Sequence, residues 1–194
     1  MISNSKSKPF FTLSASVFAL LGSLTISTIA IADDQVTLEA YKTASNTAGT
    51  LTKSGAVSFS GKKITIPTFA VEPGKPDTTF EVHGKVNPTI LVPASSQLKF
   101  ELTNMDGGMP HGLVVTTKAP PYKQVPHLSQ SDHDDNHEAG LIASTGLSGP
   151  ADGKTTVIHV RQTKWFKLLP GTYYYVCPVP GHAHKGMYGK IIAK

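Results

Sequence analysis

Polar and apolar residues alternate in three segments of the chain, as they do in half-buried β-strands. These segments are residues 63–66, 79–82 and 97–103. Aromatic and β-branched residues predict further strands at residues 89–92, 111–117, 155–160, 172–177 and 188–193. Turn signals separate them, namely Glu72-Pro73-Gly74, Asp106-Gly107-Gly108, Gly149-Pro150 and Leu169-Pro170-Gly171. Many short strands without a long amphipathic helix predict an all-β Greek-key sandwich or barrel.

The first 32 residues have the three-part pattern of a secretory signal peptide. Lys6 and Lys8 precede an uncharged run that ends in the small residues Ala30-Ile31-Ala32. We expect cleavage after Ala32, because many serine and threonine residues weaken the alternative of an uncleaved membrane anchor. The run is nevertheless long enough to cross a bilayer. Both alternatives place the folded part outside the cytoplasm, so we expect a periplasmic protein that contacts a membrane only if this segment is retained.

The remaining chain divides into two parts by composition. Residues 33–55 are polar and predict an N-terminal extension, with a short helix over residues 36–44, that lies over the main domain. Residues 56–194 carry the strand pattern and form that domain. Removing residues 1–32 takes away two lysines and no acid, which lowers the formal charge from +5 to +3. Without a basic cluster or a phosphate-binding glycine loop, this mild charge does not indicate nucleic acid binding.

The only cysteine begins a loop rich in metal-binding side chains. Cys177 is followed by His182 five residues later and by Met187 after five more. Thiolate, imidazole and thioether together suit copper. A fourth ligand must come from elsewhere, and His111 is the best candidate because it opens an apolar run after a glycine-containing turn. A lone Cys or Met is most often a packing residue, but the regular spacing and the second histidine favour a metal site.

The same segment resembles the C-terminal ligand loop of the cupredoxins, the small blue-copper proteins. The residues that carry the resemblance are Pro170-Gly171-Thr172-Tyr173-Tyr174-Tyr175-Val176-Cys177, Pro180-Gly181-His182-Ala183, Gly186-Met187, Gly189-Lys190-Ile191, Phe80-Glu81-Val82-His83, Asn87-Pro88-Thr89 and Pro120-Pro121-Tyr122. The resemblance implies a cupredoxin fold and one type 1 copper ion held by His111, Cys177, His182 and Met187. The family spacing selects His182 and leaves His184 on the surface.

Residues around the predicted ligands lead to further expectations. We expect Asn104 and Asp106 to hydrogen-bond across to the Cys177 loop. The family member that the segment resembles most has asparagine at both of these positions, whereas this chain has Asp106 at the second. It also has glycine before the first ligand and serine after it, whereas Pro110 and Gly112 flank His111 here. We expect Met109 to cover the metal as an apolar residue. We expect structural roles for His83 and His159, and packing in the core or at its edge for Trp165 and Phe166.

Residues 126–139 contain a second group of histidines and carboxylates. These are His127, Asp132, His133, Asp134, Asp135, His137 and Glu138. His133 and His137 would share a face if the segment were helical. We expect a solvated loop, and the alternative is a partner-docking loop or a weak second metal site.

Two classes of function fit the predicted copper site. The first is a monomeric electron carrier whose partners are a c-type cytochrome, a terminal oxidase, or both. The second is a copper storage or delivery protein. A four-ligand site with a cysteine favours the carrier, because delivery sites are more open. An enzyme is not predicted, since turnover needs an open coordination position or a second copper. For a carrier, Met109, Pro110, Pro178, Val179 and Pro180 would give an apolar contact area around the edge of His182.

Overall fold

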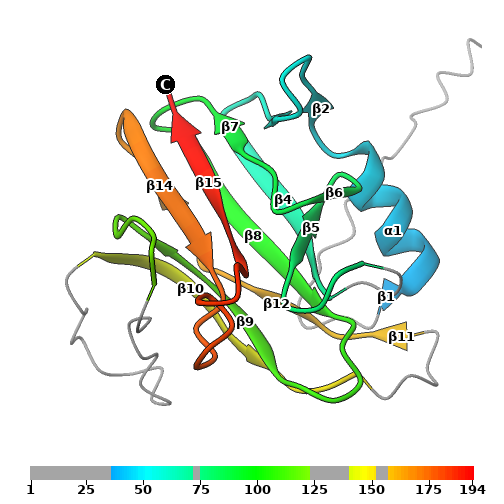
Figure 1. The fold of residues 1–194 in the computed structure, drawn as a ribbon. Helices are drawn as coiled ribbons and strands as arrows, with labels where there is room; N and C mark the ends of the chain where they lie inside the picture. The colour runs from blue at the N-terminus through cyan, green and yellow to red at the C-terminus, as the bar shows by residue number, and fades with distance from the viewer. Residues whose placement is uncertain (1–35, 72–74, 123–139, 152–156) are drawn as a thin grey trace, which may run out of the picture. The chain divides into compact units, whose positions relative to one another are not determined.

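The computed structural model describes residues 36–71, 75–122, 140–151 and 157–194. They form β-strands and one short helix, and most strands belong to two sheets (Figure 1). The seven-stranded sheet has the order β10-β9-β14-β15-β7-β3-β2. Its strands are β2 (Thr50–Leu51), β3 (Val57–Ser58), β7 (Ile90–Val92), β9 (His111–Thr116), β10 (Leu141–Ser148), β14 (Gly171–Val176) and β15 (Tyr188–Ala193).

The second sheet has the order β12-β8-β4-β5-β6, with β13 also paired to β8. Its strands are β4 (Lys63–Ala70), β5 (Phe80–Val82), β6 (Lys85–Val86), β8 (Gln97–Asn104), β12 (Val160–Gln162) and β13 (Phe166–Lys167). β4 and β8 run parallel in continuous register from Lys63 opposite Gln97 to Ala70 opposite Asn104. This ladder carries β8 as far as Asn104, where the chain turns toward the first predicted ligand.

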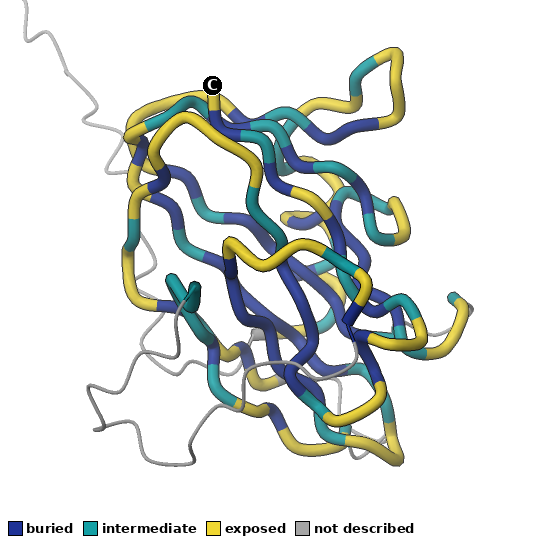
Figure 2. Tube along the Cα trace, turned by 60° about the vertical axis from the view of Figure 1, so that its left-hand side comes forward, coloured by how far each residue is buried: buried dark blue, intermediate teal, exposed yellow. Residues whose placement is uncertain are grey.

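Both sheets contribute to one apolar core. Ile66, Leu98 and Phe100 come from the second sheet, and Ile90 and Tyr175 come from the first. Figure 2 shows the buried stretches of these strands gathered in the interior of the described region. Cys177 and Met187 belong to the same buried cluster. Two of the predicted ligands therefore lie at the edge of the core and not on a solvent-exposed loop.

The predicted short helix is present as α1 (Leu38–Thr47). It begins later than expected because Val36–Thr37 forms β1, which pairs with β11 (Val157–Ile158). Thr37 then caps the helix start, since its side chain accepts a hydrogen bond from the Ala40 N–H. Tyr41 donates to the Glu101 carbonyl at 2.8 Å and accepts from the Thr68 N–H at 3.0 Å. The helix is thus held against β4 and β8.

The sequence predicted most strands but not all of them. Each segment named from the pattern contains strand residues, although the segment 155–160 holds all of β11 and the first residue of β12. The eight-residue β10 was missed, as were the short β1, β2, β3, β6 and β13. The mostly β prediction is correct. Residues 1–32 and 126–139 lie outside the described residues, so the signal peptide and the histidine-rich segment stay predictions, as do the domain boundaries. Among the described residues, no helix combines the length and apolar character needed to cross a membrane.

Candidate metal centre

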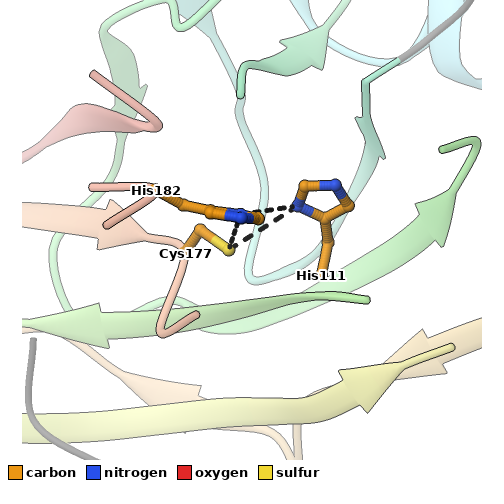
Figure 3. Close-up of side chains that lie close together, drawn as sticks. All are labelled: His111, Cys177 and His182. Atoms are coloured by element: carbon orange, nitrogen blue, oxygen red, sulfur yellow. Dashed lines mark hydrogen bonds between the residues drawn. The ribbon is translucent and has the colours of Figure 1, made fainter. Parts of the chain in front are cut away.

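Adjacent strands bring the predicted ligands together. His111 is the first residue of β9, Cys177 directly follows β14, and Met187 directly precedes β15. β14 pairs with both β9 and β15, so the ends of these strands meet at the same place. His182 lies in the turn between β14 and β15. Figure 3 shows the side chains of His111, Cys177 and His182 pointing toward one another.

Three potential ligand atoms converge in this cluster. The Cys177 Sγ lies 3.7 Å from Nδ1 of His111 and 3.6 Å from Nδ1 of His182, and the two Nδ1 atoms are 3.2 Å apart. A point equidistant from the three atoms lies about 2.0 Å from each, close to the bond lengths of about 2.0–2.3 Å that zinc forms with imidazole and thiolate. The arrangement therefore fits one first-row transition-metal ion in a trigonal set.

Solvent hardly reaches these side chains. His111, Cys177 and Met187 are fully buried, and His182 is 5% exposed. Burial in an apolar environment disfavours charge on an unligated group. It lowers the pKa of His182, and the neighbouring His111 lowers it further, although Asp106 acts in the opposite direction. A neutral imidazole offers a lone pair, which is the form that a metal ion binds.

Burial also raises the pKa of the Cys177 thiol. The backbone groups of Gly112 and Val179 oppose this effect and lower the pKa. Backbone N–H groups stabilise a thiolate in a site that excludes water. The main chain thus provides partners for the anionic sulfur that metal ligation would create.

The second ring nitrogen of His111 is occupied by Asp106. Oδ2 of Asp106 lies 3.0 Å from Nε2 of His111, while Oδ1 accepts from the N–H groups of Gly108 and Met109 at 2.7 and 3.2 Å. Although desolvation raises the pKa of this carboxyl, the hydrogen bonds from His111, Gly108 and Met109 hold it below its ordinary value. A carboxylate that accepts from Nε2–H leaves the Nδ1 lone pair free to face Cys177.

The expected contacts of Asn104 and Asp106 with the Cys177 loop are wrong. Asp106 bonds within its own turn and to His111. The Asn104 side chain donates to the carbonyls of Met109, Ser148 and Gly149, at 2.9, 3.3 and 2.8 Å. Its Oδ1 accepts from the Asp106 N–H. Both residues therefore order the turn before His111, and Asn104 also ties that turn to the end of β10.

The loop from Cys177 to Met187 is closed by its own backbone. The Cys177 N–H donates to the Met187 carbonyl, and the Met187 N–H donates to the His182 carbonyl, both at 3.0 Å. The His182 N–H donates to the Val179 carbonyl at 3.1 Å. Three of the predicted ligands thus belong to one hydrogen-bonded ring of main chain.

Gly112, which sequence analysis noted only as a departure from the family pattern, is required by close packing. A Cβ at this position would lie 2.7 Å from the Gly146 carbonyl and 3.1 Å from both Leu147 Cδ2 and Pro178 Cγ. The pairing of β10 with β9 shifts register between Ser144 and Leu147, which places Gly146 against Gly112. A serine here would not fit without a shift of β10.

The other predicted residues lie outside the ligand cluster. His184 is exposed, as expected, with Nδ1 3.3 Å from the Tyr122 carbonyl. His83 has a structural contact, because its Nδ1 lies 2.8 Å from the Ala48 carbonyl, whereas His159 is exposed. Phe166 stacks on Phe100.

Two further side chains named from the sequence are partly exposed. Met109 is 47% exposed, and its covering of the metal stays a prediction. Trp165 is 39% exposed, and the ammonium groups of Lys63 and Lys99 lie 4.5 and 5.2 Å from its ring centre. Trp165 therefore packs at the edge and not in the core, which is one of its two expected positions.

Comparison with known proteins places this geometry in a family context. A family model described as the sulfocyanin (SoxE) domain matches residues 54–194. Rusticyanin from Acidithiobacillus ferrooxidans is 39% identical over 139 residues, covering 71% of this chain and 81% of that protein. Rusticyanin from Acidithiobacillus ferridurans is 40% identical, with 67% of that protein covered. Sulfocyanin from Sulfolobus acidocaldarius is 26% identical over 143 residues, covering 69% of this chain and 65% of that protein.

Solved structures give a consistent result. Reduced rusticyanin superimposes with a TM-score of 0.68 and 34% identity, covering 83% of this chain and 99% of that chain. Rusticyanin from Thiobacillus ferrooxidans gives a TM-score of 0.68 and 35% identity over the same share of this chain. A further match, with a TM-score of 0.68, is described as a copper protein, rusticyanin. These likenesses confirm the predicted fold.

Proposed function

The chain belongs to the sulfocyanin (SoxE) domain family and is a cupredoxin similar to rusticyanin, and on this premise we propose that it is a periplasmic type 1 copper protein that carries single electrons between respiratory redox partners. The family supports the broad function, a blue copper electron-transfer protein. The location, the partners and the individual ligands are the parts that the proposal adds.

One observation carries the proposal. A thiol sulfur and two imidazole nitrogens lie 3.2–3.7 Å apart in a buried cluster, at positions that fit bonds to a single ion. We assign His111, Cys177 and His182 as the trigonal ligands. Met187 would supply the fourth, weakly bound thioether in this assignment, because its side chain is buried and its backbone is hydrogen-bonded to both Cys177 and His182. Two imidazoles, one thiolate and a weak axial thioether form the ligand set of a blue-copper site.

When bound, copper supplies a one-electron couple between Cu(II) and Cu(I). The protein's part is to hold the ligands in an arrangement that both oxidation states tolerate. β9 fixes His111, Asp106 fixes its ring, and the closed loop fixes Cys177, His182 and Met187. Because these contacts are backbone or buried, little needs to move when an electron is gained or lost. A site whose ligands move little on oxidation and reduction suits an electron carrier.

The surface near His182 supports a contact area for redox partners. His182 is the least buried of the four assigned ligands. Beside it lie Pro180, which is exposed, and Val179, which is half-buried, while Met109 is 47% exposed. Pro178 is buried and does not contribute. A small apolar surface over a nearly buried ligand suits short-lived encounters, because such contacts are weak.

The proposed setting follows from the N-terminal sequence and the cofactor. Residues 1–32 carry the pattern of an export signal, and a periplasmic carrier would exchange electrons with a c-type cytochrome, a terminal oxidase, or both. We propose that it works as a monomer and not as an enzyme, since the four assigned ligands leave no coordination position for a substrate.

Electron transfer and copper delivery are distinguished by what leaves the protein. Stopped-flow mixing of the reduced copper protein with an oxidised c-type cytochrome, in the presence of a Cu(I) chelator such as bathocuproine disulfonate, measures both outcomes at once. A carrier oxidises rapidly and keeps its copper over many turnovers. Loss of Cu(I) to the chelator within the time of one electron exchange would contradict the carrier and favour storage or delivery.

A further inference from the structure

Asn87 links the metal loop to a distant part of the chain. Its side-chain Nδ2 donates to the Gly186 carbonyl at 3.0 Å, across a separation of 99 residues. Gly186 directly precedes Met187, the assigned axial ligand. Asn87 lies between β6 and β7, and sequence analysis noted it only within the segment Asn87-Pro88-Thr89. Nothing in the function described so far accounts for this contact.

Two hydrogen bonds to the backbone of Phe80 hold Asn87 in place. Its Oδ1 accepts from the Phe80 N–H, and its own N–H donates to the Phe80 carbonyl, both at 2.8 Å. The backbone at Asn87 has a φ of +45°, which asparagine tolerates better than most residues. The side-chain amide is therefore aimed at Gly186 by a fixed backbone.

The next residue is anchored in the core. The fully buried Tyr175 donates its hydroxyl to the Pro88 carbonyl at 2.7 Å. Tyr175 lies two residues before Cys177 and faces Gly189 in the β14–β15 ladder. A Cβ at Gly189 would overlap the Tyr175 ring, so glycine is needed there for the ring to reach Pro88. Asn87 and Pro88 thus connect to both sides of the ligand loop.

The Gly186 carbonyl is where this connection meets the site. It accepts from Asn87 and also from the Tyr188 N–H at 2.7 Å. Gly186 has a φ of +104°, a conformation that favours glycine. Met187 is the next residue. Its N–H donates to the His182 carbonyl, and its carbonyl accepts from the Cys177 N–H. The position of Gly186 therefore sets where the Met187 backbone begins.

We propose that Asn87 is a positioning residue for the axial ligand, holding Gly186 so that Met187 is presented to the metal at a fixed place. The inference rests on the proposed copper site and deepens it. Without the amide donor, Gly186 would keep only local bonds, from its carbonyl to Tyr188 and from its N–H to Ala183. The Met187 end of the loop would lose its tie to the β6–β7 connection. The strength of the axial interaction, which tunes the potential of such sites, would change.

Two substitutions separate positioning from a turn-forming role. Asn87→Asp keeps an acceptor for Phe80 and tolerates a positive φ, but it cannot donate to Gly186. Asn87→Gly keeps the backbone conformation and removes both side-chain bonds. If Asn87 only shapes the turn, the aspartate variant should behave like the wild type. If it positions Met187, both variants should change the midpoint potential and the EPR spectrum of the copper protein.

The aspartate introduced by Asn87→Asp also adds a negative charge. Making the same change in the Met187→Leu variant separates the effect of this charge from the effect that acts through Met187. We expect the shift caused by Asn87→Asp to differ at least twofold between the wild-type and Met187→Leu backgrounds, because the charge contributes about equally in both and only the positioning effect is lost with Met187. A purely electrostatic effect of the aspartate would persist undiminished in that variant, and this result would overturn the proposal. So would an unchanged potential in both Asn87 variants.

A second arm uses the protein without metal, so that it does not depend on the proposed function. Amide hydrogen exchange of apo protein should show faster exchange at Met187 and Tyr188 in both Asn87 variants, by roughly threefold to tenfold for one lost hydrogen bond. Exchange at Leu98 and Phe100, in the core of β8, serves as the internal control and should not change. Unchanged exchange at Met187 and Tyr188 would overturn the positioning role even if the copper assignment were correct. Faster exchange in a protein that binds no copper would retain the tether and reject the proposed function.

Discussion

The carboxylate oxygen Oδ2 of Asp106 lies 3.0 Å from Nε2 of His111, on the opposite side of the ring from the nitrogen that faces Cys177. The same carboxylate accepts two backbone N–H groups of its own turn. It is therefore both a fixed acceptor, which sets the orientation of the ring, and a negative charge one imidazole away from the proposed copper.

This charge should lower the reduction potential, because it favours Cu(II) over Cu(I). A unit charge about 7 Å from the metal contributes about 2 kcal/mol at an effective dielectric constant near 20, which corresponds to at most roughly 90 mV for one electron. We expect Asp106→Asn to raise the potential within this range in a spectroelectrochemical titration. Asp77→Asn, which removes an exposed charge, is the control and should have little effect. An unchanged or lower potential in Asp106→Asn would contradict this role.

The packing around Gly112 predicts a stability effect. Gly112→Ala should destabilise the protein by about 1–3 kcal/mol, since its Cβ would collide with the Gly146 carbonyl between β9 and β10. Gly149→Ala is the matched control, because no atom of the described residues lies within 4 Å of a Cβ there. Urea unfolding of both variants measures the difference. Equal stability of the two would show that β10 adjusts without cost.

The hydroxyl of Tyr175 gives a second stability prediction. Tyr175→Phe leaves the Pro88 carbonyl without this buried partner, which should cost about 1–3 kcal/mol. Tyr173→Phe removes a comparable bond to Leu169 at an exposed position and should cost less than about 0.5 kcal/mol. The comparison by denaturant unfolding tests whether the tyrosine ties the ligand strand to the core. Similar losses in both variants would argue against it.

The proposed contact area near His182 predicts a kinetic effect without a spectral one. Val179→Asp should slow electron exchange with a cytochrome partner, because a charge opposes a weak apolar encounter, while the visible spectrum stays nearly unchanged. Met109→Asp, at the exposed rim, should act in the same way. Thr172→Asp, exposed at the start of β14, is the control. If changes within residues 126–139 abolish exchange and Val179→Asp does not, partners dock elsewhere.

The cluster of His111, Cys177 and His182 was predictable from sequence because the proposed ligands either lie in one short loop with regular spacing or, in the case of His111, open a strand. The hydrogen-bond partner of Asp106 was not predictable. The expected contact crossed to the Cys177 loop, but Oδ1 accepts from Gly108 and Met109, and this local turn directs the other oxygen to His111. Similarly, the tie from Asn87 to Gly186 depends on a separation of 99 residues, which no local pattern indicates.

The longest missed strand, β10, shows the limit of periodicity. Its residues are mostly half-buried and do not alternate, and Gly146 adopts a φ of +70° where the register shifts. Such a strand is specified by pairing with β9 and not by its own pattern. β4 exceeded its prediction because it continues through Pro67. On the side away from β8, β4 pairs with β5 only at Phe69 and Ala70. The N–H that proline lacks would lie on that side, where β4 has no neighbour among the described strands at Pro67.

The most direct test of the copper assignment is the visible absorption and EPR spectrum of the protein loaded with Cu(II), recorded during a reversible redox titration. A Cu(II)–thiolate bond from Cys177 predicts an intense blue or green colour that disappears on reduction and returns on oxidation, and that is absent from Cys177→Ser. A colourless wild-type protein after Cu(II) loading, or preferential retention of Zn(II), would contradict the account.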